Sequence, residues 1–270
     1  MQDLLAIIAA IFYGLSAVYF FVKFLRKHIK TERLALLFLI LGLISHGLNI
    51  LVFALEHHRF PAASLAEASS SVTWLMLLLY TFFSRRDSME VVGIILLPVA
   101  VLALVFAEIH GLNEQLHEPI IRIEWVYIHI PIMILSVATL TLTFLLAVVY
   151  LLQERQLKSR NPAFLFYRLP SLETCEDLAS KSLRFGFFLL TLGILTGMVL
   201  SKTVHGRYWS WDYKEIWALI TWVLYAVLVH GRMLAAWRGR KAAYLAIVLF
   251  ALMLFTFAGV SVIFKSYHAF

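Results

Sequence analysis

The sequence predicts an all-α, polytopic integral membrane protein with about eight transmembrane helices and with both termini outside. Three observations lead to this prediction: the composition, a series of long apolar segments, and an uneven distribution of Lys and Arg. The chain is 62% hydrophobic and only 14% charged. Soluble domains have about 45–50% apolar and about 25% charged residues. The composition therefore excludes an ordinary soluble protein.

The apolar segments have the lengths of membrane spans. A bilayer core of about 30 Å needs about 20 helical residues, and in lipid a helix satisfies its own backbone. Spans are expected at 4–25, 34–55, 72–83, 91–107, 125–152, 184–201, 215–236 and 242–264. The third is short and is expected to extend back into Ser69-Ser70-Ser71. The longest cytoplasmic connection, 153–183, is too small for a separate domain, so 1–270 is expected to form a single transmembrane domain.

The basic residues predict the orientation. Most of the 23 Lys and Arg residues lie in the odd-numbered connections, as in 23–33 and 232–241. Cytoplasmic loops carry this excess, so a multi-pass protein of the bacterial cytoplasmic membrane is expected. The topology accounts for most of the net charge of +7, and no nucleic acid is expected as a partner. The one cysteine, Cys175, excludes a disulfide framework and a cysteine-rich metal site, whereas ten histidines make His the natural metal ligand.

A tract at 208–217 places Trp, Tyr, Asp, Lys and Glu between two apolar runs. Indole rings suit the membrane–water boundary. Trp209 and Trp211, with acid and base beside them, are expected to form a flat aromatic shelf for a large planar ligand with charged substituents. An ordinary aromatic belt at a helix end is the alternative, and the tract alone does not decide between them.

Four histidines lie in or beside the expected spans, where ionisable side chains are rare. His129 and His268 lie at the outer level, with the Trp tract, whereas His46 and His230 lie deeper. His230 comes five turns after Asp212, about 27 Å along a helix. Two imidazoles at each of two levels are what two six-coordinate haems require. For each histidine, the alternative is a hydrogen bond to a neighbouring helix.

These residues resemble the tryptophan-rich (WWD) cytochrome c assembly and haem-handling superfamily, the CcsA, CcmC and CcmF-like proteins. The stretch from Tyr208-Trp209-Ser210-Trp211-Asp212 to His230-Gly231-Arg232 is similar to the family's haem-presenting segment and the helix after it. The likeness is greatest to HemX-type members, which are compact eight-helix proteins. Tyr213 departs from the proline usual in CcsA-type proteins.

The resemblance implies a haem-handling core at about 125–270 and two bis-His haem b groups. His129 and His268 match the family's outer iron ligands, and His46 and His230 match the inner ones. The haem propionates are expected to meet Arg207, Lys214 or Lys202, each of which could instead be a solvated charge. Asp212 and Glu215 are expected at a helix N-terminus or as groups that orient a ligand.

Three functions follow. The leading one is a non-catalytic haem-binding membrane protein linked to haem biosynthesis, for which the resemblance implies glutamyl-tRNA reductase as a partner. The second is a haem translocase subunit of a cytochrome c synthase system, with an apocytochrome c as acceptor. The third, a transmembrane electron carrier, is disfavoured because the four histidines come from four different spans.

Overall fold

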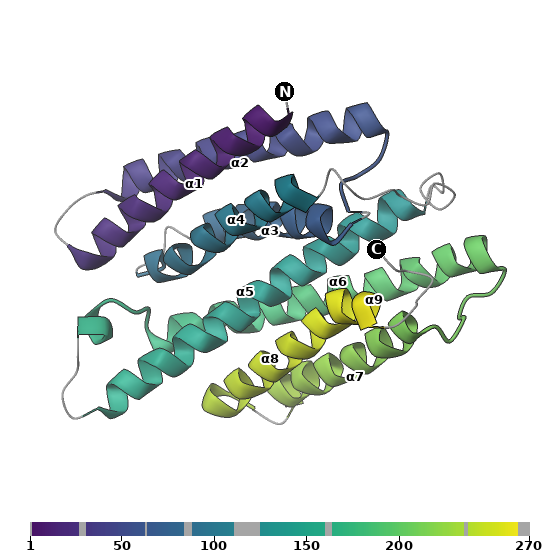
Figure 1. Ribbon diagram of the computed structural model, residues 1–270. Helices are drawn as coiled ribbons and strands as arrows, with labels where there is room; N and C mark the ends of the chain where they lie inside the picture. The colour runs from purple at the N-terminus through teal and green to yellow at the C-terminus, as the bar shows by residue number, and fades with distance from the viewer. Residues whose placement is uncertain are drawn as a thin grey trace. The chain divides into compact units, whose positions relative to one another are not determined.

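The computed structural model describes residues 2–26, 31–62, 64–83, 88–110, 125–159, 164–234 and 237–263. All regular structure in these ranges is helical, and eight helices there are long and apolar enough to cross a membrane. The predicted fold class is therefore confirmed. The chain forms two compact units (Figure 1), one of residues 1–116 and 156–170 and one of residues 117–155 and 171–270.

The first unit contains four long helices and a short 3₁₀ turn: α1 (Gln2–Leu25), α2 (Glu32–His57), α3 (Leu65–Phe83), α4 (Glu90–His110) and η2 (Phe164–Tyr167). Helix α1 packs against α2 and α4, and α3 packs against the same two helices. Gly42 permits the close approach of α1 and α2, since a Cβ there would lie 2.6 Å from Cδ1 of the buried Tyr13 ring. Small residues at membrane-helix contacts commonly have this role.

The second unit contains α5 (Val126–Lys158, except its last three residues), α6 (Leu172–His205), α7 (Tyr213–Leu234) and α8 (Gly239–Leu254), followed by the π-helical turn η3 (Phe255–Gly259) and α9 (Val260–Ile263). Helix α7 packs against both α6 and α8. Hydrogen bonds join α5 to α6: Ser136 Oγ donates to Gly186 O over 3.0 Å, and the Thr143 and Ser182 hydroxyls are 2.8 Å apart.

Several helices are longer than their apolar cores predict. The connection expected at 153–183 is much shorter, because α5 continues to Lys158 and α6 begins at Leu172. The Ser171 hydroxyl caps α6 by accepting from Thr174 N over 3.1 Å. Hydropathy predicts only the part of a helix that lies in lipid, so it does not predict polar turns that extend the helix beyond the bilayer. In the same way, α3 begins at Leu65, earlier than expected.

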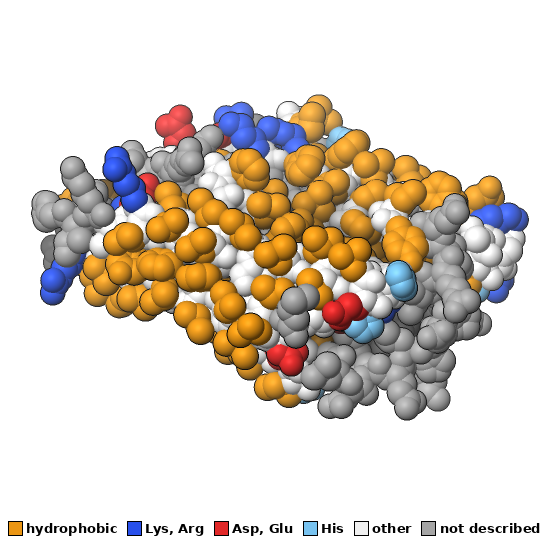
Figure 2. All heavy atoms as spheres, turned by 90° about the horizontal axis from the view of Figure 1, so that it is seen from above, with side chains coloured by type: hydrophobic (Ala, Val, Ile, Leu, Met, Phe, Trp, Pro, Cys, Tyr) orange, Lys and Arg blue, Asp and Glu red, His pale blue; other side chains and the backbone are white. Residues whose placement is uncertain are grey.

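The helices present large apolar surfaces, as lipid-facing helices do. Leu4, Ile7 and Ile11 follow one another along α1 at helical spacing and are 61%, 55% and 56% exposed. Figure 2 shows hydrophobic side chains over much of the face in view. In water such surfaces would favour aggregation, whereas in a bilayer they are solvated. The protein is a multi-pass membrane protein.

Candidate functional site

The first half of the Trp tract, 208–212, lies in the turn between α6 and α7, and its second half begins α7. Helix α6 ends at His205, and Gly206 follows with φ +74°, its N–H donating to Lys202 O over 3.0 Å. Trp211 also has a positive φ, +62°, which is uncommon for a residue with a side chain. This conformation reverses the chain just before α7, and the Trp211 side chain is 71% exposed.

Two carboxylates lie at the start of α7. The Asp212 backbone carbonyl accepts from Ile216 N over 3.0 Å, so the buried Asp212 immediately precedes the first turn. Glu215 accepts from Ser210 N over 2.7 Å and from the Ser201 hydroxyl over 3.3 Å. Acidic groups are stabilised at this end of a helix by its dipole. Glu215 therefore fixes the Trp turn to the end of α6 as well as to α7.

A cavity of about 120 Å³ lies below this turn, within the second unit. Its lining includes His129 of α5, Tyr208, Trp209, Lys214 and Glu215, together with three methionines, Met133, Met198 and Met253. Sites that enclose a ligand have volumes of about 300–1,000 Å³. A planar macrocycle would therefore enter this cavity by one edge, while the rest of it lay against the turn.

His129 is held with one ring nitrogen bonded to the backbone. Its Nδ1 lies 2.9 Å from Gly193 O of α6. A carbonyl oxygen can only accept, so Nδ1 carries the proton and the lone pair is on Nε2, the arrangement that metal-binding histidines use. Gly197 makes room for the ring, because a Cβ at that position would lie 2.9 Å from His129 Cε1.

Trp209 carries a polar group that nothing in the described part of the chain satisfies. Its Nε1 is buried without a hydrogen-bond acceptor, and the neighbouring Ser210 hydroxyl is likewise buried without a partner. Buried polar groups without partners are few in folded proteins. By contrast, Trp222 Nε1 donates to Thr191 Oγ1 over 2.9 Å. The unmet donor at the cavity suits an acceptor from a ligand, and a haem propionate is such an acceptor.

The two indoles do not form the flat shelf that was expected. The Trp209 and Trp211 rings are 6.0 Å apart at 81°, an edge-to-face arrangement. The positive φ of Trp211 turns its side chain out of the plane of Trp209, and aromatic pairs favour this geometry. One ring therefore lines the cavity while the other stands exposed beside it.

The structure separates the cations that were expected to meet propionates. Lys214 is half-buried and lines the cavity, near Asp212. Arg207 is exposed and is not among the residues that line the cavity. Lys202 is exposed, and its ammonium donates to Gly206 O over 2.7 Å. His268 lies outside the described residues, so its pairing with His129 stays a prediction.

The two deeper histidines belong to different units. His46 of α2 is fully buried, with Nδ1 3.2 Å from Tyr13 Oη and Nε2 2.9 Å from Ser70 Oγ. His230 of α7 is exposed, and its Nδ1 lies 2.8 Å from Ala226 O, one turn earlier. Their pairing at an inner haem also stays a prediction.

The π-helical turn, Phe255–Gly259, was not predicted from the sequence. Thr256 and Phe257 of this turn line the cavity, and Thr256 Oγ1 lies 2.8 Å from Thr221 Oγ1 of α7. Such turns frequently occur at functional sites. No proline or charged residue marks Phe255–Gly259 in the sequence, so only Gly259 gave any local signal. The three methionines of the cavity were not predicted either, because in the sequence they do not differ from other apolar residues of the spans.

Membrane-length helices, with a Trp-rich turn beside a cavity lined by a histidine, define a polytopic membrane protein with a candidate ligand site at the ends of its helices. The chain belongs to the cytochrome c assembly protein family, which it matches over residues 34–268.

Among its relatives are cytochrome c biogenesis proteins named CcsA. The CcsA of Guillardia theta is 31% identical over 80% of this chain and 78% of its own length. That of Trieres chinensis is 30% identical over 82% and 83%, and that of Mesostigma viride is 27% identical over 98% and 93%.

A solved structure, the cytochrome c haem lyase CcmF, superposes with a TM-score of 0.67 at 17% sequence identity, covering 95% of this chain. The match covers 46% of the CcmF chain, so this chain spans less than half the length of that protein. At this identity the likeness concerns the fold.

Proposed function

We propose that this protein presents haem for cytochrome c assembly, as the haem translocase subunit of a cytochrome c synthase system. The observation that carries the proposal is the cavity lined by His129, Lys214 and Trp209, whose indole N–H has no acceptor among the residues that the structure describes. Membership of the cytochrome c assembly family and the similarity to CcsA proteins support it. The three relatives named above are CcsA proteins, not HemX-type ones. This favours cytochrome c maturation over the link to haem biosynthesis.

In this proposal haem is the cargo, and the side chains bind it by its iron, its propionates and its ring. His129 Nε2 ligates the iron from one side, and His268 is proposed as the second ligand. Trp209 N–H and the Lys214 ammonium bind a propionate, since charge-assisted hydrogen bonds are the strong ones. The exposed Trp211 covers part of the ring, and Arg207 meets the second propionate from the solvent side. Asp212 and Glu215 hold the turn and do not bind the anionic groups.

A second haem b with His46 and His230 as its ligands is retained as a proposal from the sequence alone. His46 would have to exchange one of its two hydrogen bonds for iron, and the bond to Ser70 is the one at Nε2. The acceptor of the outer haem is proposed to be an apocytochrome c. The Lys and Arg distribution supports an orientation with the Trp turn on the non-cytoplasmic side, and a bacterial cytoplasmic membrane is proposed as the location. No described feature favours glutamyl-tRNA reductase as a partner.

The test combines a deletion strain with the purified protein. Deletion should abolish covalent cytochrome c, and the wild-type gene should restore it. Purified full-length chain should contain b-type haem by pyridine haemochrome, and His129→Ala should lose most of the outer haem. His57→Ala is the matched control, because His57 is exposed and its described contacts, a hydrogen bond to Phe53 O and stacking on the Phe53 ring, are with a residue of its own helix. Normal cytochrome c in the deletion strain, with a changed level of glutamyl-tRNA reductase, would instead favour the biosynthetic role.

A further inference from the structure

A second and larger pocket lies at the opposite ends of the same helices. It has a volume of about 630 Å³, within the range of ligand sites. Helices α5, α6 and α7 and the residue before α8 form it. Its charged lining consists of three acidic residues and three arginines: Glu173, Glu176, Asp177, Arg184, Arg232 and Arg238. The Lys and Arg distribution predicts that this end faces the cytoplasm. The proposed outer haem site shares no lining residue with it.

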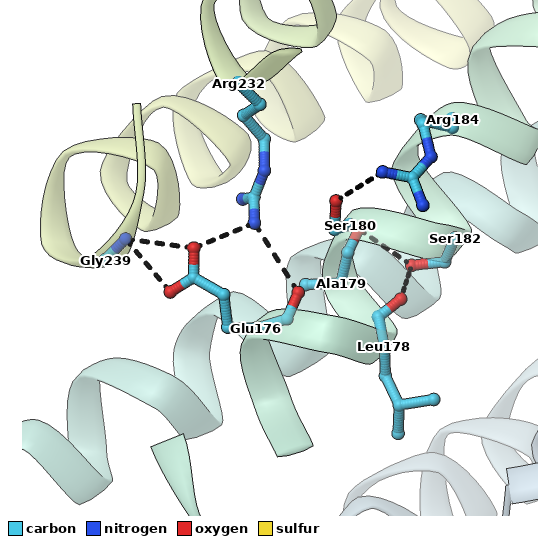
Figure 3. A network of polar contacts seen from close by, with 8 residues as sticks. All are labelled: Glu176, Leu178, Ala179, Ser180, Ser182, Arg184, Arg232 and Gly239. Carbon is cyan, nitrogen blue, oxygen red and sulfur yellow. Dashed lines mark hydrogen bonds and ion pairs between the residues drawn. The ribbon is translucent and has the colours of Figure 1, made fainter. Parts of the chain in front are cut away.

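Glu176 is fully engaged by protein groups. Its carboxylate accepts from Arg232 Nη2 over 3.0 Å and from Gly239 N, the first residue of α8, over 3.0 Å (Figure 3). This bridge joins α6, α7 and α8 and holds one wall of the pocket. Asp177 is paired with Lys181 at 2.8 Å, and Lys181 lies outside the lining. Two of the three acidic residues are therefore neutralised.

Arg184 and Arg238 are the two arginines of the pocket that could bind an anionic ligand. Arg184 Nη1 donates to the neutral Ser180 hydroxyl over 3.0 Å, and Figure 3 shows Arg184 and Arg232 on either side of Ser180. Within the described ranges neither Arg184 nor Arg238 forms a salt bridge. The remaining acid, Glu173, lies in the first turn of α6, where the helix dipole stabilises it. The pocket therefore offers two guanidinium groups to a ligand.

An apolar stripe leads from the pocket into the expected bilayer. Phe188 and Leu195 follow Arg184 at i+4 and i+11, on the same face of α6, and are 56% and 52% exposed. Met233, which lines the pocket, is 64% exposed. A soluble anion would use the arginines and leave this surface unused. A ligand with an anionic head and a long apolar tail would use both.

We propose that this pocket binds the headgroup of an anionic phospholipid of the cytoplasmic leaflet. The guanidinium groups of Arg184 and Arg238 bind the phosphate, for which Arg offers paired donors. An acyl chain lies along Phe188 and Leu195. Basic pockets between helices on this side of the membrane are suited to anionic headgroups. The bound lipid stabilises the joint between α6, α7 and α8 that Glu176 forms.

The test uses the purified, delipidated full-length protein. Native mass spectrometry should show phosphatidylglycerol retained at least about tenfold more than phosphatidylcholine, as expected for a charge-assisted contact. Thermal unfolding should shift upward with phosphatidylglycerol only. Arg184→Gln combined with Arg238→Gln should abolish the preference. Arg240→Gln is the matched control, since Arg240 lies at the same end of the unit but bonds to Tyr244 Oη and is not in the lining.

Equal retention of the two lipids, or an unchanged preference in the double variant, overturns the proposal. Equal protection by inorganic phosphate overturns the lipid as the source of the phosphate group. A photoactivatable phosphatidylglycerol tests wild-type protein without any variant. It should label peptides of 172–188 in α6 or 229–234 in α7, and labelling confined to other segments contradicts the site.

Discussion

The surroundings of His129 and His46 differ in how completely their polar groups are satisfied. Beside His129 lies a cavity, with the Trp209 N–H and the Ser210 hydroxyl buried and unpartnered in the described structure. Around His46, both ring nitrogens are bonded, to Tyr13 Oη and Ser70 Oγ, and the imidazole is fully buried. Both histidines were predicted to bind iron, because each lies in or beside an expected span and matches a ligand position of the family.

This difference separates a site that is ready for a ligand from one that is already packed. Buried polar groups are almost always hydrogen-bonded, so a polar group that remains unmet beside a cavity indicates a missing partner. A histidine with both nitrogens bonded contributes to folding in its present state, and a ligand must displace one bond. The outer site should therefore respond to mutation mainly in haem binding, and the surroundings of His46 mainly in stability.

The largest expected effect is that of His46→Ala on stability. The substitution leaves a void and removes the partner of both Tyr13 Oη and Ser70 Oγ in a buried place. The free energy of unfolding should fall by about 2–4 kcal/mol, measured by thermal or denaturant unfolding in detergent. His129→Ala is the comparison, and should cost roughly 1 kcal/mol because that ring is only half-buried. Equal losses in the two variants would remove the distinction between the two sites.

An intermediate effect is expected from Gly197→Ala. The new Cβ would lie 2.9 Å from His129 Cε1, so the imidazole must move while the helix is retained. Haem affinity at the outer site should fall roughly tenfold, as for other changes that disturb the orientation of a metal ligand, with little change in unfolding. Haem titration followed by absorbance measures it. Gly14→Ala controls for the helix itself, since nothing lies within 4 Å of that Cβ; unaltered haem affinity in Gly197→Ala would show that the ring does not hold the iron.

The number and class of the helices could be predicted from the sequence because lipid leaves a spanning backbone few alternatives. The Trp turn could be located for a similar reason, as indoles collect at the membrane boundary. The ends of α5 and α6 could not, because their polar outer turns have no hydropathy signal and Ser171 fixes one end by a cap.

The different roles of residues close together in the sequence could not be predicted either. Trp209 and Trp211 looked equivalent, yet one positive φ puts the first beside the cavity and leaves the second exposed. Lys214 and Arg207 were equal candidates for a propionate, and only the start of α7 turns Lys214 to the cavity. The π-helical turn depends on packing against α7, through Thr221 and Thr256, and carries no local signature.

The smallest expected effect, and the most specific, comes from Trp209→Phe compared with Trp222→Phe. Both changes remove an indole N–H from the second unit, but among the described residues only the Trp222 N–H has an acceptor, Thr191 Oγ1 at 2.9 Å. Trp222→Phe should therefore lower the free energy of unfolding by about 1 kcal/mol and leave haem affinity unchanged, because it removes one hydrogen bond inside the protein while the Thr191 hydroxyl still donates to Phe187 O. Trp209→Phe should change stability by less than about 1 kcal/mol but weaken haem binding roughly 3- to 10-fold, because the lost bond is to the ligand. Unfolding in detergent and haem titration on the same preparations measure both quantities. If Trp209→Phe loses stability and keeps full haem affinity, the Trp209 N–H serves the fold through a partner outside the described residues, and haem does not meet it.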